Sequence, residues 1–372
     1  MSGGGARAAY QVGFLRALAR QFPELQVPIV TGVSAGAINA ALLASREGSF
    51  GSRVETLAEL WSELHPEAVY RVGMFSLLRN MARTGMRLLS GGAVKTHRLY
   101  SLVDTAPVKA LLERVLGAQG DEIPGIARNI ASGALHAVAV TASNYGTGQS
   151  ITFVQGRDIQ MWERAHRRSV SCKLRVEHVM ASAALPMLFP AVEVGHQWFG
   201  DGGIRLTAPL SPAVHLGARR IIAISTRYGR SQAEADQPAT DGYPPIAQIA
   251  GVLFNAIFLD QFDADALSLQ RVNRVVERLP EAARGDLAQV ELLLLRPSRD
   301  LGRLANEYEA ELPRAFRFMT RGLGTRETRS NDMLSLVMFQ PDYLARLIEL
   351  GETDAQTRMK EIESFLAAPA VR

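Results

Sequence analysis

The sequence of 372 residues predicts an α/β fold with a mostly helical C-terminal extension. Two observations support this class. Short β-branched runs alternate with segments of helical composition through the first 226 residues, and a polar break near residue 235 leads into a mainly helical region. With 47% hydrophobic and 21% charged residues, the chain can bury a full core. We expect one domain at residues 1–235 and a second region at 236–372 packed on it.

The first elements follow from the spacing of apolar residues. The segment ARAAYQVGFLRALARQF places apolar side chains at steps of three and four, which predicts a helix directly after the glycines at residues 3–5. The run VPIVTGVS predicts a short strand that ends at Gly32, and AGAINAALLASRE predicts a second helix. The predicted order is therefore strand, sharp turn and helix.

The later elements are predicted in the same way. Residues from about 70 to 100 mix apolar side chains with four glycines and lack clean periodicity, so we expect a mobile cap or a pair of surface helices. LHAVAVTASNY and SITFVQG are predicted to pair as strands, and RRIIAIST to be a buried strand of a parallel sheet. A long amphipathic helix is expected from Ile246 to about Leu279, followed by a strand at QVELLLLRP and further helices.

Composition narrows the range of partners and compartments. The formal charge of +4 is spread along the chain without a basic block or an aromatic-basic face, so nucleic-acid binding is not expected. The single cysteine, Cys172, excludes an intrachain disulfide and favours the cytoplasm. No stretch reaches the roughly 18 to 20 apolar residues of a membrane span, and no secretory signal is evident. These features predict a soluble protein, with peripheral membrane contact left open.

GVSAG at residues 32–36 fits the nucleophile-elbow pattern. In that pattern Gly32 and Gly36 let strand and helix pack closely around a strained turn that carries Ser34. The N-terminus of the helix stabilises an oxyanion, and Ala35 supplies the N–H group that follows the nucleophile. The same pattern also occurs by chance in turns of small residues, so its position between a strand and a helix favours the functional interpretation.

A serine nucleophile needs a group that accepts its proton, and histidine is the first candidate. None of the seven histidines lies in a recognisable catalytic motif, and the chain lacks the Ser, acid, His order and the preceding strands of an α/β-hydrolase. We therefore expect structural or supporting roles for them. The histidines are His65, His97, His136, His166, His178, His196 and His215.

The segment WFGDGGIRLTAPL is the other conspicuous motif, because Asp201 follows an apolar run and precedes Gly202 and Gly203. Asp-Gly-Gly alone is common in turns and does not by itself indicate a catalytic site. In combination, GGGAR, GVSAG, SAALPMLFP and DGG resemble the ordered motifs of the patatin-like phospholipase family, over residues 3–226. The resemblance implies a three-layer α/β/α fold with a mainly parallel central sheet. It also implies a Ser-Asp dyad, with Ser34 as the nucleophile and Asp201 as the base.

The resemblance further implies a role for the N-terminal glycines. The backbone N–H groups of Gly3, Gly4 and Gly5 would form an oxyanion hole that no Cβ obstructs, and Arg7 would brace either the loop or the developing charge. An unperturbed aspartate, with a pKa of about 3.9, is a weak base for a serine hydroxyl. Burial raises that pKa, and oxyanion stabilisation lowers the barrier, so a dyad without histidine is chemically reasonable.

Three features depart from the family pattern. Ala8 stands where many relatives have glycine, and TAP at residues 207–209 stands where an asparagine often precedes the proline. The glycine loop of the family normally follows the first strand of the sheet, whereas only Met1 and Ser2 precede Gly3. We expect the codons upstream of Met1 to encode a short apolar β-type run.

The resemblance implies an ester of a glycerolipid or lysolipid as substrate, and no cofactor or metal is expected. Three alternatives stay open at this point: an acyltransferase that uses the same serine, a regulatory lipid-binding protein, and a dinucleotide-binding protein. GGGARA approximates a dinucleotide fingerprint with Glu24 near the ribose-binding position, but it lacks a preceding strand and leaves Ser34 and Asp201 unexplained.

The segment IAGVLFNAIFLDQF is strongly apolar. It is compatible with a core helix, with a contact in a homo-oligomer, or with a surface that rests on a membrane. A position in the core is the default expectation.

Overall fold

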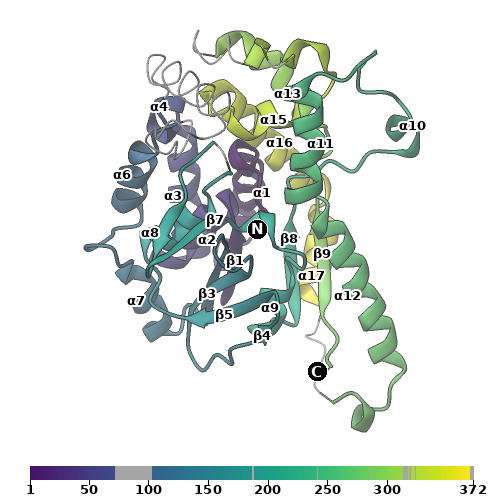
Figure 1. Cartoon of the computed structure of the whole chain (residues 1–372). Helices are drawn as coiled ribbons and strands as arrows, with labels where there is room; N and C mark the ends of the chain where they lie inside the picture. Colours follow the sequence, from purple (N-terminus) through teal and green to yellow (C-terminus); the bar gives the residue numbers. More distant parts are fainter. Residues whose placement is uncertain are drawn as a thin grey trace.

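The computed structural model describes residues 1–71, 103–186, 188–240, 242–285, 287–312, 317, 320–322 and 324–368 (Figure 1). The expected cap at about 70–100 lies almost entirely outside these residues. The described helices are α1 (Ala8–Gln21), α2 (Ala35–Ser45), α3 (Phe50–Ser62), α4 (Pro66–Val69), α6 (Ala106–Val115), α7 (Pro124–Ser132), α8 (Val176–Ser182), α9 (Ser211–His215), α10 (Gln232–Ala235), α11 (Ile246–Phe258), α12 (Gln261–Arg278), α13 (Leu301–Tyr308), α15 (Asp332–Val337), α16 (Pro341–Thr357) and α17 (Met359–Ala367). The short 3-10 turns are η1 (Gly5–Arg7), η2 (Gly202–Ile204), η3 (Glu281–Ala283), η4 (Glu309–Glu311) and η5 (Thr325–Glu327).

The described strands are β1 (Ile29–Val33), β2 (Ala137–Asn144), β3 (Ser150–Gly156), β4 (Glu163–Arg164), β5 (Arg167–Ser171), β6 (Val192–Val194), β7 (Gln197–Asp201), β8 (Arg220–Ile224) and β9 (Glu291–Leu295). Seven of them form a central sheet in the order β4-β5-β3-β2-β7-β6, and β1 pairs with β2. β8 and β9 form a separate parallel pair. These elements confirm the α/β class and each strand that the sequence predicts.

The central sheet is mixed, so the expectation of a mainly parallel sheet is wrong. β1 is parallel to β2 and β3 to β5, but the other four pairs are antiparallel. Short loops are the physical reason for three of these pairs, β2–β3, β4–β5 and β6–β7, because strands joined by a few residues can only pair antiparallel. β6 and β7, for example, are connected by Gly195 and His196, which both have positive φ, as a tight two-residue hairpin turn requires.

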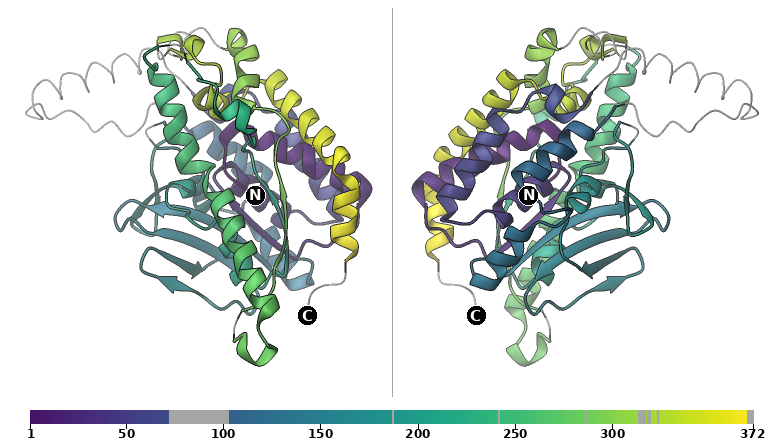
Figure 2. Two further views of the ribbon diagram at one scale, coloured as in Figure 1. Left: turned by 90° about the vertical axis from the view of Figure 1, so that its right-hand side faces the viewer. Right: turned by 90° about the vertical axis from the view of Figure 1, so that its left-hand side faces the viewer.

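Helices α2, α7 and α8 cover one face of the central sheet, and the short helix α9 with the segments around Trp162 and Leu216 covers the other (Figures 1 and 2). Alternate residues of a strand point to opposite faces. Val138 and Val140 of β2 accordingly pack into the main core with α1, α2 and α8, whereas Ala139 packs on the other face against Trp162 and Leu216. The sheet is therefore the middle of three layers.

The C-terminal residues share this core. α16 lies along α1, and the two helices approach closely through glycine: a Cβ on Gly13 would lie 1.9 Å from the carbonyl oxygen of Ile348, and a Cβ on Gly351 would lie 2.2 Å from that of Tyr10 (Figure 2). As a result α1 is buried around nearly its whole circumference, beyond the single face that its pattern predicts. The division at residue 235 stays a prediction.

Met1 and Ser2 bridge β1 and β8. The amino group of Met1 donates to the Thr31 carbonyl oxygen at 2.8 Å, and the Val33 N–H donates to the Met1 carbonyl oxygen at 3.4 Å. The Ser2 N–H donates to the Ile224 carbonyl oxygen at 3.2 Å. Beside this bridge lies a cavity of about 570 Å³ whose lining includes residues of both strands. The start of the glycine loop is thus hydrogen-bonded to strands on both sides.

The predicted helix from Ile246 to Leu279 is two helices, α11 and α12, with a break at residues 259–260. The outer face of α11 is exposed, so the expectation that this segment lies in the core is wrong for that face. None of the described helices combines the length and the hydropathy that crossing a bilayer requires. The residues of this outer face are Ile246, Ile249, Val252, Leu253 and Ile257.

Candidate active site

Two strands end at neighbouring positions on one edge of β2. β1 runs parallel to β2, and its last residue, Val33, pairs with Thr141. β7 runs antiparallel to β2, and its last residue, Asp201, pairs with Ala142. Ser34 follows Val33 directly. The sheet therefore brings together the two motifs that the sequence analysis singled out.

Ser34 lies on a strained turn between β1 and α2. Its φ of 57° and ψ of −132° are rare for a residue with a side chain, and such backbone strain is typical of functional turns. Its N–H donates to Ser182 Oγ at 3.0 Å, and Ser182 Oγ donates to the Thr141 carbonyl oxygen at 2.6 Å. A Cβ on Gly32 would lie 2.2 Å from the Gly36 carbonyl oxygen, so the turn needs glycine there.

Asp201 is fully buried. Its Oδ1 accepts a hydrogen bond from the Gly203 N–H at 2.8 Å, and its Oδ2 has no hydrogen-bond partner among the described residues. Burial raises the pKa of Asp201 from 3.8 to about 7, although the nearby Ser34 hydroxyl and the Gly203 amide act in the opposite direction. A carboxyl group with this pKa exchanges protons readily near neutral pH.

The glycines after Asp201 allow other groups to approach closely. A Cβ on Gly202 would lie 2.0 Å from the Thr141 carbonyl oxygen, and a Cβ on Gly203 would lie 2.3 Å from a ring carbon of Phe258 in α11. Any larger residue would displace β2 or α11. These two glycines therefore fix the position of Asp201 relative to the sheet.

The N-terminal glycine loop lies against Ser34. A Cβ on Gly3 would lie 3.5 Å from Ser34 Oγ, and Gly4 and Gly5 both have positive φ. The amides of Gly3 and Gly4 donate to no other described residue. Gly5 and Ala35 are the first residues of helical turns, where amides have no acceptor within the helix. Several backbone N–H groups next to the serine are thus free to bind an anionic oxygen.

Groups distant in the sequence hold this loop in place. Thr226 Oγ1, just after β8, donates to the Gly3 carbonyl oxygen at 2.7 Å. The buried Arg7 guanidinium donates to Asp332 Oδ1 and Ser335 Oγ of α15, each at 2.6 Å. The loop is therefore clamped between the β8 strand and a helix from the C-terminal region.

Every site residue that the sequence predicts lies in this cluster, and the catalytic role of each stays a prediction. Sequence reasoning missed Ser182, Thr226, Asp332 and Ser335. Ser182 belongs to the SAALPMLFP segment, so a signal existed for it, whereas nothing near Asp332 marks it in the sequence. The predicted residues are Gly3, Gly4, Gly5, Arg7, Gly32, Ser34, Ala35, Gly36, Asp201, Gly202 and Gly203.

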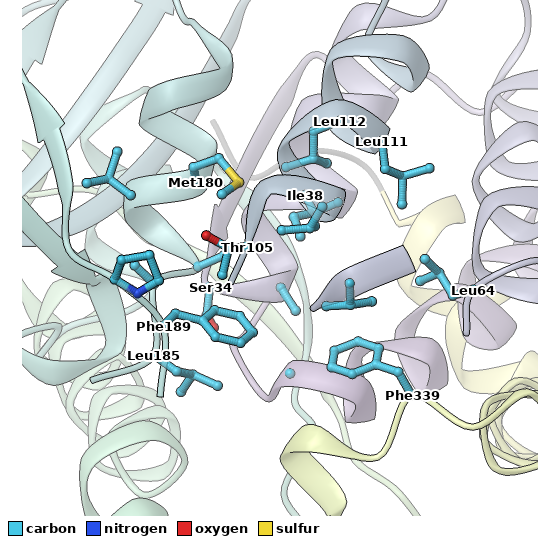
Figure 3. A pocket seen from close by; sticks show the side chains of 18 of the residues that line it. Ser34, Ile38, Leu64, Thr105, Leu111, Leu112, Met180, Leu185, Phe189 and Phe339 are labelled. Carbon is cyan, nitrogen blue, oxygen red and sulfur yellow. The ribbon is translucent and has the colours of Figure 1, made fainter. Parts of the chain in front are cut away.

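An apolar pocket opens at Ser34 (Figure 3). Its walls come from α2, α3, α6, α8 and the loop that follows α8, and Leu64 and Leu111 lie on the far side from Ser34. The enclosed space is about 60 Å³. The lining includes Ile38, Trp61, Val108, Leu112, Met180, Leu185, Phe189 and Phe339.

The described histidines lie elsewhere. None of them lines the pocket or hydrogen-bonds to Ser34. Nδ1 of His178 accepts from the Arg175 N–H at the start of α8, and its ring packs against Phe153. Burial lowers the pKa of His178 to about 4. His97 lies outside the described residues.

Among the described residues, no group of three or more His, Cys, Asp or Glu side chains is arranged to hold a metal ion.

Comparison with known proteins identifies the family of this chain. No curated protein matches the sequence. Among solved structures, the crystal structure of VipD from Legionella pneumophila aligns with 97% of this chain and 66% of VipD, at 13% sequence identity and a TM-score of 0.38. This chain thus spans 66% of the length of VipD. The sequence profile of the patatin-like phospholipase family matches residues 1–214, which is more than half of the 372 residues. The chain therefore belongs to the patatin-like phospholipase family.

Proposed function

We propose that this protein is a lipid acyl hydrolase that uses Ser34 as its nucleophile and Asp201 as its base. One observation carries the proposal. The ends of β1 and β7 meet on β2, so that a strained, buried serine lies next to a carboxyl group with a pKa of about 7, at the wall of an apolar pocket. Acyl transfer by a serine requires this combination of a nucleophile, a base and a binding site for the acyl group.

In the acylation half, Ser34 Oγ attacks the ester carbonyl carbon while its proton passes to Asp201 Oδ2. The new bond gives a tetrahedral intermediate with a negative oxygen. When that intermediate collapses, the ester C–O bond breaks and Asp201 returns the proton to the departing alcohol. The acyl group stays on Ser34. The free Oδ2 of Asp201 supports this assignment, because it has room to accept one hydrogen bond.

In the deacylation half, a water molecule takes the place of the alcohol. Asp201 accepts a proton from the water as its oxygen attacks the acyl carbon. Collapse of the second intermediate breaks the bond to Ser34 Oγ, and Asp201 returns the proton to that oxygen. The carboxylic acid leaves, and the dyad regains its starting state.

The oxyanion in both intermediates needs donors that are already in place. The unpaired amides of Gly3, Gly4, Gly5 and Ala35 are the candidates, since they surround the serine and two of them begin helical turns. Loss of one such donor typically costs about 3 to 4 kcal/mol of transition-state stabilisation. We therefore assign much of the rate enhancement to this loop.

The pocket favours a substrate with a hydrocarbon chain. Its lining is almost entirely aliphatic and aromatic, and it starts at Ser34, so an acyl chain would extend from the reacting carbon toward Leu64 and Leu111. A glycerolipid or lysolipid ester fits this arrangement.

Turnover of p-nitrophenyl esters and of phospholipids tests the proposal. We expect hydrolysis by the wild-type protein and a loss of at least three orders of magnitude in Ser34→Ala and in Asp201→Asn, with unchanged circular dichroism. Substantial residual activity in either variant would contradict the dyad. Addition of a primary alcohol as a competing acceptor separates hydrolysis from acyl transfer, because a transferase would form the new ester in preference to the free acid.

A further inference from the structure

The outer face of α11, defined above by five residues from Ile246 to Ile257, is apolar and exposed. The exposed fractions of these side chains lie between 38% and 62%. Their spacing of three or four residues forms a stripe along the helix, and no charged residue occurs anywhere in α11. Tyr243, just before the helix, is 91% exposed. An exposed apolar stripe along an uncharged helix is typical of a contact with lipid or with another protein surface.

The inner face of α11 is also apolar, and it packs beside the candidate active site. Phe258 contacts the position where Gly203 lacks a Cβ. Phe258 also clusters with Leu185 and Phe189, two residues that line the pocket at Ser34. A helix that is apolar on both faces normally lies in a protein core or in contact with lipid. Among the described residues, protein covers only the inner face of α11.

We propose that the outer face of α11 docks on the surface of an anionic phospholipid bilayer. This inference rests on the proposed function, since a hydrolase of membrane lipids must bring its pocket to the bilayer. α11 and the pocket share Leu185 and Phe189, so a lipid surface that contacts the outer face of the helix lies about one helix width, about 10 Å, from this wall of the pocket. Interfacial helices of this kind insert their apolar face into the headgroup region.

The size of the outer face argues against a second copy of the chain as its partner. A helix of 13 residues is about 20 Å long and about 10 Å wide, so one face covers on the order of 200 Å². A stable dimer buries roughly 800 Å² on each partner. A bilayer needs no complementary shape, and a small apolar stripe is enough to anchor a protein that also makes electrostatic contacts.

Positive charge lies at the N-terminal end of α11. Pro245 precedes the helix and packs against Gly324, at the start of the segment that carries Arg326. Within residues 321–327, Arg321 and Arg326 are exposed and form no ion pair with any described residue, and Glu327 is the exposed carboxylate of that segment. Arginines at this end attract anionic headgroups. The charge thus favours an anionic lipid surface over a neutral one.

Vesicle flotation tests the proposal. The full chain and the double variant Ile249→Ser/Leu253→Ser are mixed with vesicles of phosphatidylcholine and phosphatidylserine. Because each serine removes apolar surface from the contact, we expect the vesicle-bound fraction of the variant to fall roughly tenfold or more. A matched control, Leu267→Ser/Val275→Ser, removes equally exposed apolar side chains from α12. This control is expected to bind like the wild type, and thermal unfolding verifies that both variants fold.

The outcomes separate docking from catalysis. Equal flotation of the wild type and the α11 variant, or no flotation of the wild type, would overturn the docking inference. A change from dimer to monomer in light scattering, without a change in flotation, would overturn it in favour of a second copy. Flotation that depends on α11, together with no ester hydrolysis by the wild type, would support docking and refute the proposed function. Ser34→Ala is expected to float normally, since docking requires no chemistry.

Discussion

Arg7 and Asp332 lie 325 residues apart in the sequence and form a buried ion pair, with Nη2 of Arg7 2.6 Å from Oδ1 of Asp332. The other oxygen of Asp332 accepts from Asn255 Nδ2 of α11, also at 2.6 Å. Arg7 closes the glycine loop, so this chain of contacts ties the loop next to Ser34 to two helices of the C-terminal region. We infer that residues beyond 235 help to position the loop.

Asp332→Ala tests that coupling. The substitution leaves the Arg7 guanidinium buried without its partner, which is expected to lower the free energy of unfolding by about 3 to 5 kcal/mol and to lower kcat. Urea denaturation and ester turnover measure the two effects. Glu361→Ala, which removes a more exposed ion pair with Arg358, is the control and should cost less than about 1 kcal/mol. Equal effects of the two substitutions would contradict a special role for Asp332.

The pH dependence of turnover reports on Asp201. Its pKa of about 7 means that the carboxyl group is mostly protonated below neutrality and cannot accept the Ser34 proton. We expect kcat/KM to rise about tenfold per pH unit below pH 7 and to level off above it. A profile that is flat from pH 5 to pH 8 would exclude Asp201 as the base.

The free energy of unfolding depends on the same carboxyl group, but it is expected to fall as pH rises, whereas kcat/KM is expected to rise. Because folding raises the pKa of Asp201 from 3.8 to about 7, the folded state binds a proton that the unfolded state has released between these two values. The free energy of unfolding should therefore fall as pH rises through this window, by on the order of 4 kcal/mol in total. Asp201→Asn removes this dependence.

Denaturation at pH 4 and at pH 8 measures this effect. The Asp201→Asn variant should gain stability relative to the wild type at the higher pH, because the wild type alone then carries a buried charge. An equal difference between the two proteins at both pH values would show that burial of this carboxyl group does not shift its ionisation.

The pocket predicts a chain-length preference that Leu111 controls. Leu111 is half-buried and lies on the far side of the pocket from Ser34. A bulkier Leu111→Trp side chain would fill that end, so turnover of a long-chain p-nitrophenyl ester should fall about tenfold or more, the loss of about 1.4 kcal/mol of binding. Turnover of the acetate ester, which does not reach that end, is the internal control. Equal losses for both esters would place the acyl chain elsewhere.

The sequence alone is sufficient to locate Ser34 and Asp201, because each lies in a short motif of neighbouring residues. GVSAG and DGG are short turn motifs that can be recognised without the fold, although only Gly32 is needed at a contact a few residues away, with Gly36, whereas Gly202 and Gly203 contact the distant Thr141 and Phe258. Three strands of the central sheet, β1, β2 and β3, are equally recognisable, since β-branched and apolar runs mark them, whereas the short strands β4 to β7 are not predicted from the sequence. Local motifs therefore locate Ser34, Asp201 and their glycines, and the resemblance to the patatin-like family implies that the two residues form a dyad.

Features that depend on long-range packing were not predictable in this way. The direction of a strand depends on the path by which the chain returns to the sheet, and no local motif reveals that path. The antiparallel pairing of β7 with β2 is therefore not predicted from the sequence. Asp332 acts on Arg7 only after α15 reaches the loop, and no nearby residue signals that contact. The apolar pattern of α11 shows which residues share a face, but only the fold determines that, within the described part of the chain, protein covers the inner face and leaves the outer face exposed.

Labelling with a fluorophosphonate probe tests the central claim most directly. The probe phosphonylates an activated serine, and mass spectrometry of the digested protein identifies the modified residue. We predict a single adduct on the peptide that contains Ser34, no adduct in Ser34→Ala, and labelling at least a hundredfold slower in Asp201→Asn, a loss of about 2.7 kcal/mol. An adduct on another serine, or equally fast labelling of Asp201→Asn, would contradict the assignment of Ser34 and Asp201 as a catalytic dyad.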